Sequence, residues 1–286
     1  MKLTIISGRS GSGKSTALRA LEDAGYNSID NFPVGLLQSL VENAIGDVAQ
    51  KDGSMAVCID ARNKELDRFP EILSGLDRLD VDCQVIYLDA LSPTLVKRFS
   101  ETRRRHPLTD ANTDLRQAID AESTLLENIS DLADLTIDTT LLSGQELVEF
   151  MKSRVIANTA SGLSLLFRSF GFKFGVPVDA DLVFDLRCLP NPHWMEELRP
   201  LTGLDAPVEH YLESAKMVND MFDDIVNYLE TWLPHFEGNH RIYMTVGLGC
   251  TGGQHRSVYM AERLGSHFEE HHENVLVRHR ELDRRQ

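Results

Sequence analysis

The stretch 5-IISGRSGSGKSTALRALEDAGY-26 decides the fold of the first half of the chain. Within it, residues 8–15 fit the pattern G-x-x-x-x-G-K-[ST] at every fixed position. A short apolar run precedes the glycines, and a helical stripe of alanines and leucines follows them and stops at Gly25. The stretch therefore predicts a buried strand, a phosphate-binding loop and a helix, in that order.

This loop has the chemistry of a nucleotide site. Its glycines let backbone N–H groups turn toward phosphate oxygens, and the helix N-terminus adds partial positive charge. We expect Lys14 to reach the β- and γ-phosphates and Ser15 to ligate Mg²⁺, with ATP or GTP as the nucleotide. The expected nucleotide contacts in the loop are Gly8, Arg9, Ser10, Gly11, Ser12, Gly13, Lys14 and Ser15. A glycine-rich structural turn is the alternative interpretation, which the flanking strand and helix disfavour.

An acidic residue is needed for the metal, and Asp60 follows the apolar stretch 55–59 at the place of a Walker-B carboxylate. Lys14, Ser15 and Asp60 are therefore the candidate catalytic residues. The segment 60-DARN-63 also suits a nucleotide base or ribose, because one carboxylate can accept both N–H donors of a guanine. The expected contacts there are Asp60, Ala61, Arg62 and Asn63. A surface acid at a strand end is the alternative, and Asp30 is a rival acid where small-molecule kinases hold substrate.

The densest basic run is Arg103, Arg104, Arg105 and His106. Arginines placed in this way stabilise charge on a γ-phosphate, and a solvated basic turn is the alternative. The amphipathic pattern over residues 114–132 has no strand before it, so it predicts a lid helix.

Short apolar runs alternate with helical patterns along the whole chain, which predicts α/β architecture with parallel sheets. Strands are expected at 55–61, 84–90, 135–139, 182–187, 242–249 and 275–279, and a long helix from Pro207 to the residue before Pro234. Small and polar residues at 157–164 predict a linker. We therefore expect a P-loop nucleotide-binding domain at 1–156 and a second, smaller α/β domain at 164–286.

Composition limits the classes of function. The 286 residues carry a net charge of −15, which argues against nucleic-acid binding over the whole surface. The four cysteines are scattered without a CxxC pair, which suits a reducing cytoplasm and argues against a disulfide framework or a zinc ribbon. The sequence has no run of 18 apolar residues and no charged-then-apolar leader, so no membrane span is expected.

The second half contains another phosphate-type loop, 249-GCTGGQHRS-257, again between an expected strand and an expected helix. Cys250, Gly253 and Arg256 have the C-x₂-G-x₂-R spacing of cysteine-dependent phosphatases, where a thiolate and an arginine clamp hold phosphate. The histidine usual before the cysteine is replaced by Gly249. Asp181 or Asp185 would supply the acid for a leaving group. Anion binding without turnover, phosphatase chemistry and a structural turn all stay open here.

The C-terminal segment 274–286 is the best candidate for a basic patch. It has four arginines against two acids, net +2, on an otherwise acidic chain. The expected RNA phosphate contacts are Arg278, Arg280, Arg284 and Arg285. An ordinary charged tail is the alternative.

Taken together, GRSGSGKS, IDNFP, ETRRRHPL, LPNPHW, LRPLTGLD and GCTGGQHRS resemble the RapZ family of RNase adapters and its YvcJ-type P-loop relatives over essentially the whole chain. The resemblance implies weak ATPase or GTPase activity in the first domain. It implies a second domain similar to a phosphofructokinase fragment that binds glucosamine-6-phosphate and small regulatory RNA, presentation of RNA to an endoribonuclease, and a homo-oligomer. The implied phosphosugar contacts are Asp181, Asn191, His193, Cys250, Thr251, Gly252, Gly253, His255 and Arg256. The enteric members carry a lysine-rich C-terminal cluster, and the corresponding region here is less basic.

The sequence therefore predicts a cytoplasmic regulatory protein with a nucleotide site in one domain and a phosphosugar site in the other. A P-loop small-molecule kinase, and a cysteine-dependent phosphatase in the second domain, are the alternatives.

Overall fold

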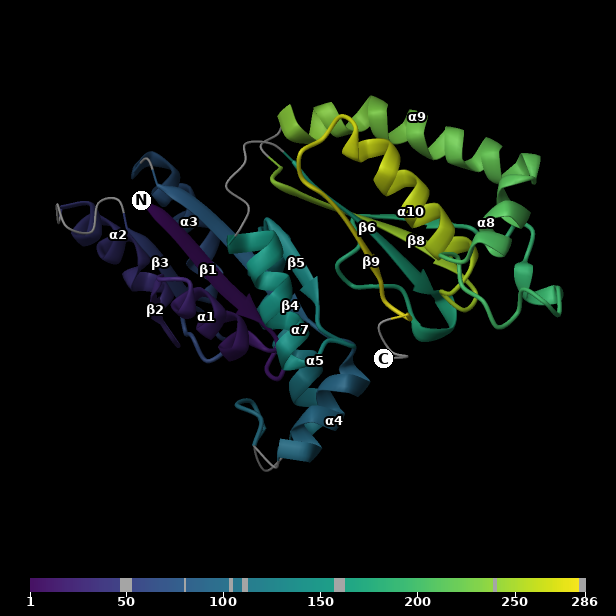
Figure 1. The fold of residues 1–286 in the computed structure, drawn as a ribbon. Coiled ribbons are helices and arrows are strands. Elements are labelled where there is room, and N and C mark those ends of the chain that lie inside the picture. Colours follow the sequence, from purple (N-terminus) through teal and green to yellow (C-terminus); the bar gives the residue numbers. More distant parts are fainter. Residues whose placement is uncertain are drawn as a thin grey trace. The chain divides into compact units, whose positions relative to one another are not determined.

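The computed structural model describes residues 1–46, 53–79, 81–102, 105–109, 113–156, 163–238 and 241–282. The chain forms two compact units, residues 1–157 and residues 158–286. Each unit is built on a parallel sheet (Figure 1), so the prediction of a two-domain α/β protein is confirmed. The expected linker falls mainly on residues 157–162, which lie outside the described part. None of the described helices has the length and apolar character needed to cross a membrane.

The first unit has a five-stranded sheet in the order β2-β3-β1-β4-β5, with all neighbours parallel. Its strands are β1 (Lys2–Gly8), β2 (Asn27–Ile29), β3 (Ser54–Cys58), β4 (Asp82–Asp89) and β5 (Leu135–Asp138). Its helices are α1 (Lys14–Asp23), α2 (Leu37–Gly46), α3 (Phe69–Leu76), α4 (Ser92–Thr102), α5 (Leu115–Leu125), α6 (Glu127–Asp131) and α7 (Gly144–Met151). The carboxyl ends of parallel strands meet at one edge, so β1, β3 and β4 deliver their following loops to the same place.

The second unit has a four-stranded parallel sheet in the order β7-β8-β6-β9. Its strands are β6 (Ser164–Gly171), β7 (Leu182–Asp185), β8 (Tyr243–Cys250) and β9 (Val275–His279), and its helices are α8 (Ala206–Glu213), α9 (Lys216–Gly238) and α10 (Arg256–Glu269). Strands β6 and β8 are buried along their whole length, and their inward side chains pack with α8, α9 and α10 into one apolar core.

Two helix predictions were wrong. The expected single helix over 114–132 is broken at the fully buried Leu126, where the backbone leaves helical geometry and separates α5 from α6. The expected helix from Pro207 is broken between α8 and α9, and α9 continues past Pro234 instead of ending before it. Leu233, next to this proline, is 1% exposed in the core. Its burial offsets the backbone hydrogen bond that a proline removes.

Strand β6 was not predicted, although it is central to the second sheet. It follows directly on the polar stretch at 157–162, and arginine and serine interrupt its apolar run. Arg168 is 4% exposed because its guanidinium donates to the Asp179 carboxylate at 2.5 Å inside the unit. A buried ion pair of this kind replaces the apolar alternation that sequence patterns detect.

Replacing Arg168 by methionine should destabilise the second unit by about 3 kcal/mol, because the Asp179 carboxylate would lose its charged partner inside the protein. Both tryptophans of the chain, Trp194 and Trp232, belong to this unit. Urea unfolding followed by tryptophan fluorescence therefore reports on it selectively. The matched control is Lys216→Met, which removes an exposed ion pair with Asp220 and should cost less than about 0.5 kcal/mol. Equal effects of the two substitutions would contradict the importance of the buried pair.

Candidate functional site

The loop between β1 and α1 has the conformation that phosphate binding requires. Gly8, Gly11 and Gly13 have φ values of 142°, 85° and 105°, which favour glycine. A Cβ added at Gly8 would lie 2.0 Å from the carbonyl oxygen of Leu88 in β4, so no other residue fits against the neighbouring strand. Gly13 is the N-cap of α1, and the open N–H groups of that helix follow it.

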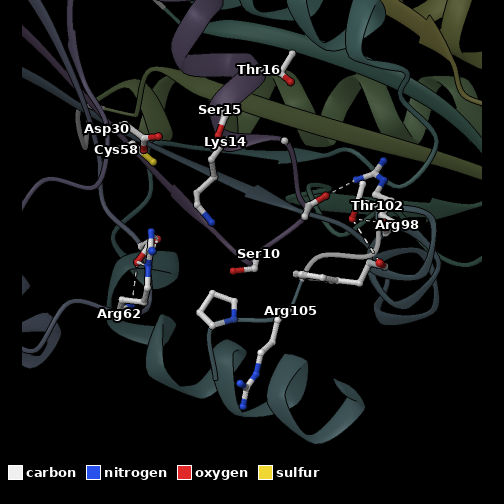
Figure 2. Close-up of a pocket in the computed structure, with 15 residues that line it drawn as sticks. Ser10, Lys14, Ser15, Thr16, Asp30, Cys58, Arg62, Arg98, Thr102 and Arg105 are labelled. Carbon is white, nitrogen blue, oxygen red and sulfur yellow. Dashed lines mark hydrogen bonds and ion pairs between the residues drawn. The ribbon is translucent and has the colours of Figure 1, made fainter. Parts of the chain in front are cut away.

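A cavity of about 420 Å³ opens against this loop (Figure 2). From the loop it is lined by Ser10, Gly11, Gly13, Lys14, Ser15 and Thr16. From the ends of β2 and β3 it is lined by Asp30, Cys58, Asp60 and Arg62. From α4 and the segment after it come Arg98, Phe99, Thr102, Arg105 and Pro107. The cavity therefore combines backbone donors and cationic side chains with a wall of acidic groups.

Lys14 and Ser15 both line this cavity, as a P-loop lysine and its metal-ligating hydroxyl would. The Lys14 ammonium donates to the carbonyl oxygen of Gly8 at 2.6 Å, across the loop. Figure 2 shows the Lys14 side chain extending toward Ser10. The lysine thus places its charge at the beginning of the loop, opposite the helix N-terminus.

Arg9 does not face the cavity with its side chain. Its guanidinium is buried and donates to the Asp89 carboxylate at 2.7 Å, the Ser92 hydroxyl at 2.9 Å and the Ala90 carbonyl at 2.5 Å. These hydrogen bonds tie the loop to the end of β4. Arg9 therefore positions the backbone of the loop, and its neighbour Ser12 is likewise buried.

Asp60 and Arg62 form a local pair at the cavity wall. The Arg62 guanidinium donates to both carboxylate oxygens of Asp60, with the shortest distance at 2.5 Å, and the Arg62 backbone N–H donates at 2.9 Å. Burial alone raises the pKa of Asp60, but the hydrogen bonds and charge of Arg62 lower it overall. Asn63 instead donates to the Phe32 carbonyl at 3.0 Å, and Ala61 is buried, so only Asp60 and Arg62 of the stretch 60–63 line the cavity.

Two further residues complete this wall of the cavity: Asp30 adds a second carboxylate, and Cys58 adds an apolar group. Asp30 and Cys58 lie at the ends of β2 and β3, beside Asp60. Burial raises the pKa of the Cys58 thiol to about 12, with a smaller contribution from the neighbouring Asp30. The thiol is therefore neutral at physiological pH and acts as a small apolar surface.

Arg98 in α4 is a site residue that sequence reasoning missed. Its guanidinium donates to the Gly11 carbonyl at 3.0 Å and to Thr139, which follows β5. Burial lowers its pKa, although an arginine stays charged. Of the basic run predicted nearby, Arg105 lines the cavity and His106 is buried, while Arg103 and Arg104 lie outside the described residues. The single arginine in an amphipathic helix pattern gave no signal that would have found Arg98.

The second loop joins β8 to α10 in the second unit. The Cys250 sulfur accepts the Gly253 N–H at 3.2 Å and lies 3.2 Å from the Ser257 hydroxyl. Burial alone raises the pKa of the Cys250 thiol, but these hydrogen bonds and the charge of Arg256 lower it overall. Gly253 has φ 70°, and a Cβ there would lie 2.3 Å from the Glu281 carboxylate. The loop is thus built around a polarised sulfur.

Arg256 is buried at the start of α10 and holds the neighbouring loop. Its guanidinium donates to the carbonyls of Arg187 and Leu189 at 3.0 Å each, and more weakly to that of Leu186. Its Nε, like the Nε2 of the adjacent His255, is buried without a hydrogen-bond partner in the described protein. Burial also lowers the pKa of His255. Two buried nitrogen groups at one helix N-terminus suit an acceptor-rich ligand.

The remaining phosphosugar candidates are placed differently. The rings of His193 and His255 are 6.4 Å apart, and Asn191 caps the turn by accepting the His193 N–H at 3.3 Å. Asp181, in contrast, is bonded to Thr245 and Arg241 near the start of β8. Cys250 is five strand positions beyond Thr245, so Asp181 lies roughly 16 Å from the loop and is not brought to it. Its role there is to hold the beginning of β8.

The C-terminal arginines expected to contact RNA differ in their exposure to solvent. Arg280 is 8% exposed, pairs with Glu281 at 2.8 Å and donates to the carbonyls of Gly171 and Gly175. It therefore packs inside the unit instead of facing solvent. Arg278 is exposed, and Arg284 and Arg285 lie outside the described residues.

Family models match both units. The description "RapZ-like N-terminal domain" matches residues 1–159, and "RapZ C-terminal domain" matches residues 163–283. A nucleotide-binding protein of Pseudomonas putida is 55% identical over 99% of this chain and 100% of its own length. A nucleotide-binding protein of Hahella chejuensis is 51% identical over 99% of each chain. Among solved structures, a Janibacter sugar kinase has a TM-score of 0.36 at 18% identity, covering 53% of this chain and 92% of its own.

Proposed function

The chain belongs to the RapZ family, and we propose that it is a regulatory nucleotide-binding protein that binds ATP or GTP in its first unit and a phosphosugar in its second. The observation that carries the nucleotide half is the cavity in which Lys14, Ser15 and the glycine loop meet. Loop N–H groups and the Lys14 ammonium bind the phosphates, and the Arg98 and Arg105 guanidiniums add positive charge. The Arg62 side chain, partly exposed, lies where it can reach the ligand.

The oxygen donors at this cavity fit Mg²⁺, which prefers hydroxyl and carboxylate ligands. The Ser15 hydroxyl and the Asp60 carboxylate would hold it, and bound Mg²⁺ would neutralise charge on the phosphates. Both oxygens of Asp60 are engaged by Arg62. Hydrolysis is therefore expected to be weak, because the acid that supports the metal is already paired.

Replacing Lys14 by alanine should abolish nucleotide binding, because the main positive charge on the β- and γ-phosphates is removed. Calorimetric titration of the full chain with ATP and GTP, with Mg²⁺, measures this loss. The control is Lys97→Ala, which removes an exposed lysine of the same unit and should leave affinity unchanged. Unaltered affinity in Lys14→Ala would contradict the site. Transfer of phosphate to an added metabolite, faster than basal hydrolysis, would favour a small-molecule kinase instead.

The phosphosugar half of the proposal is supported by the buried His255 and Arg256 nitrogens at the N-terminus of α10. A phosphate accepts hydrogen bonds from such groups, and the sugar hydroxyls would meet the turn at Asn191 and His193. The neighbouring residue Cys250 is 3% exposed, so we infer binding without turnover. Glucosamine-6-phosphate is the proposed ligand.

Full-length protein should bind glucosamine-6-phosphate in a calorimetric titration, and Arg256→Lys should weaken binding about tenfold or more because a lysine lacks the planar fork of donors. Arg263→Lys, on the same helix but directed at Phe222 and Asn219, should bind as the wild type does. Tryptophan fluorescence checks that both variants are folded. A wild type that does not bind would contradict the proposal, and release of inorganic phosphate would favour a phosphatase.

The proposed output is binding of a small regulatory RNA and its presentation to an endoribonuclease, by a homo-oligomer. Arg278, Arg284 and Arg285 are the proposed phosphate-binding side chains, since Arg280 is occupied inside the unit.

Changing Arg278, Arg284 and Arg285 to alanine should weaken RNA binding. It should also make the slope of log affinity against log salt concentration shallower by about 1 for each arginine–phosphate pair removed. Changing the exposed Arg19, Arg78 and Arg116 removes the same charge elsewhere and is the control. Equal losses of affinity in both triple variants would contradict a local RNA site.

A further inference from the structure

Helix α5 places a carboxylate against the nucleotide loop. The Glu122 side chain is 0% exposed and accepts the Ser10 N–H at 2.8 Å and the Ser10 hydroxyl at 2.7 Å. The ring Nε2 of His106 lies 3.0 Å from the same carboxylate. None of the nucleotide-loop chemistry derived above uses this acid, which nonetheless bonds to a residue that lines the cavity.

The hydrogen bonds around Glu122 are those of an ionised carboxylate beside a neutral histidine. The Leu108 N–H donates to Nδ1 of His106 at 3.2 Å, so Nδ1 is an acceptor and Nε2 carries the proton. Glu122 then accepts three hydrogen bonds, two from Ser10 and one from His106, and donates none. The carboxylate is held in these three bonds by neutral donors, so none of them cancels its negative charge.

The position of Glu122 matches the γ-phosphate end of the loop. In a P-loop the backbone amides cradle the α- and β-phosphates, while the lysine reaches the β- and γ-phosphates. Here the Lys14 ammonium bonds to the carbonyl of Gly8, two residues before Ser10, so the γ-phosphate end lies toward Ser10. In Figure 2 the Lys14 side chain points to Ser10 and away from Thr16.

We propose that Glu122 is a specificity-determining residue, an internal anion that opposes the γ-phosphate and lowers the affinity of the loop for a nucleoside triphosphate relative to the diphosphate. This inference rests on the nucleotide site proposed above. It adds how that site discriminates between nucleoside triphosphates and diphosphates. The cations that face the cavity act on all the phosphates, whereas the carboxylate acts most strongly on the group nearest to Ser10. In a medium of intermediate dielectric constant, one extra negative charge across the loop from the γ-phosphate changes the affinity for the triphosphate by roughly tenfold.

The geometry provides an isosteric test in Glu122→Gln. The Ser10 N–H and His106 Nε2 both bond to Oε2, and the Ser10 hydroxyl bonds to Oε1. A glutamine oxygen in the Oε2 position keeps the first two bonds, and its NH₂ group donates to the Ser10 hydroxyl oxygen. The variant therefore removes the charge while keeping the packing. Asp120→Asn on the exposed face of α5 removes the same charge away from the loop and is the matched control.

The experiment is calorimetric titration of the full chain, with Mg²⁺, by the non-hydrolysable β,γ-imido triphosphates of adenosine and guanosine and by the corresponding diphosphates. In Glu122→Gln the ratio of triphosphate to diphosphate affinity should rise about tenfold. The ratio should stay at the wild-type value in Asp120→Asn. Glu122→Asp keeps the charge but shortens the side chain. In this variant the affinities for triphosphate and diphosphate should fall by the same factor, so their ratio stays unchanged.

A ratio unchanged in Glu122→Gln, or changed equally in Asp120→Asn, would overturn this inference while leaving the nucleotide site intact. Failure of the wild type to bind any of these nucleotides would overturn both. Wild-type affinities give a further check that needs no variant, in case Glu122→Gln does not fold. A triphosphate preference below about tenfold, or a preference for the diphosphate, supports an opposing charge, and a larger triphosphate preference contradicts it.

Discussion

The close approach of β1 to β4 is the constraint on which the nucleotide site depends. At Gly8 the two backbones leave no room for a Cβ, because the Leu88 carbonyl occupies that position. The loop that follows must therefore begin beside the end of β4, where the Arg9 guanidinium can reach Asp89, Ser92 and Ala90. Because the Arg9 hydrogen bonds hold this side of the loop against β4, the following glycines and the start of α1 are free to face a ligand.

The sequence predicted the alternation of strands and helices and the two glycine loops well, because each loop lies between an apolar strand and an amphipathic helix. It failed where tertiary interactions outweigh local pattern. Strand β6 contains Arg168, which is buried and pairs there with Asp179, a residue beyond the end of the strand. Glu122 gave no signal either, since its partner Ser10 is 112 residues away. Polar residues that are buried with a polar partner resemble surface residues in a sequence.

The same strand–loop–helix arrangement is used differently in the two units. In the first, charged side chains such as Arg9 and Glu122 bond to the outside of the loop and leave its lysine facing a cavity. In the second, the guanidinium of the motif arginine, Arg256, donates to carbonyls of the adjacent turn and so holds that turn in place. The spacing of a phosphate-type motif therefore indicates a glycine loop between a strand and a helix in both cases, whereas the use of each side chain depends on its neighbours.

The bond between Glu281 and the backbone N–H of Gly171 also constrains how the protein is made. These residues are 110 positions apart, and the Glu281 carboxylate also lies against Gly253. During synthesis on the ribosome, the nucleotide-binding unit has all its strands long before Glu281 is added. The Cys250 loop reaches its final geometry only after that residue emerges. A nascent chain therefore completes its first glycine loop early and its second one late.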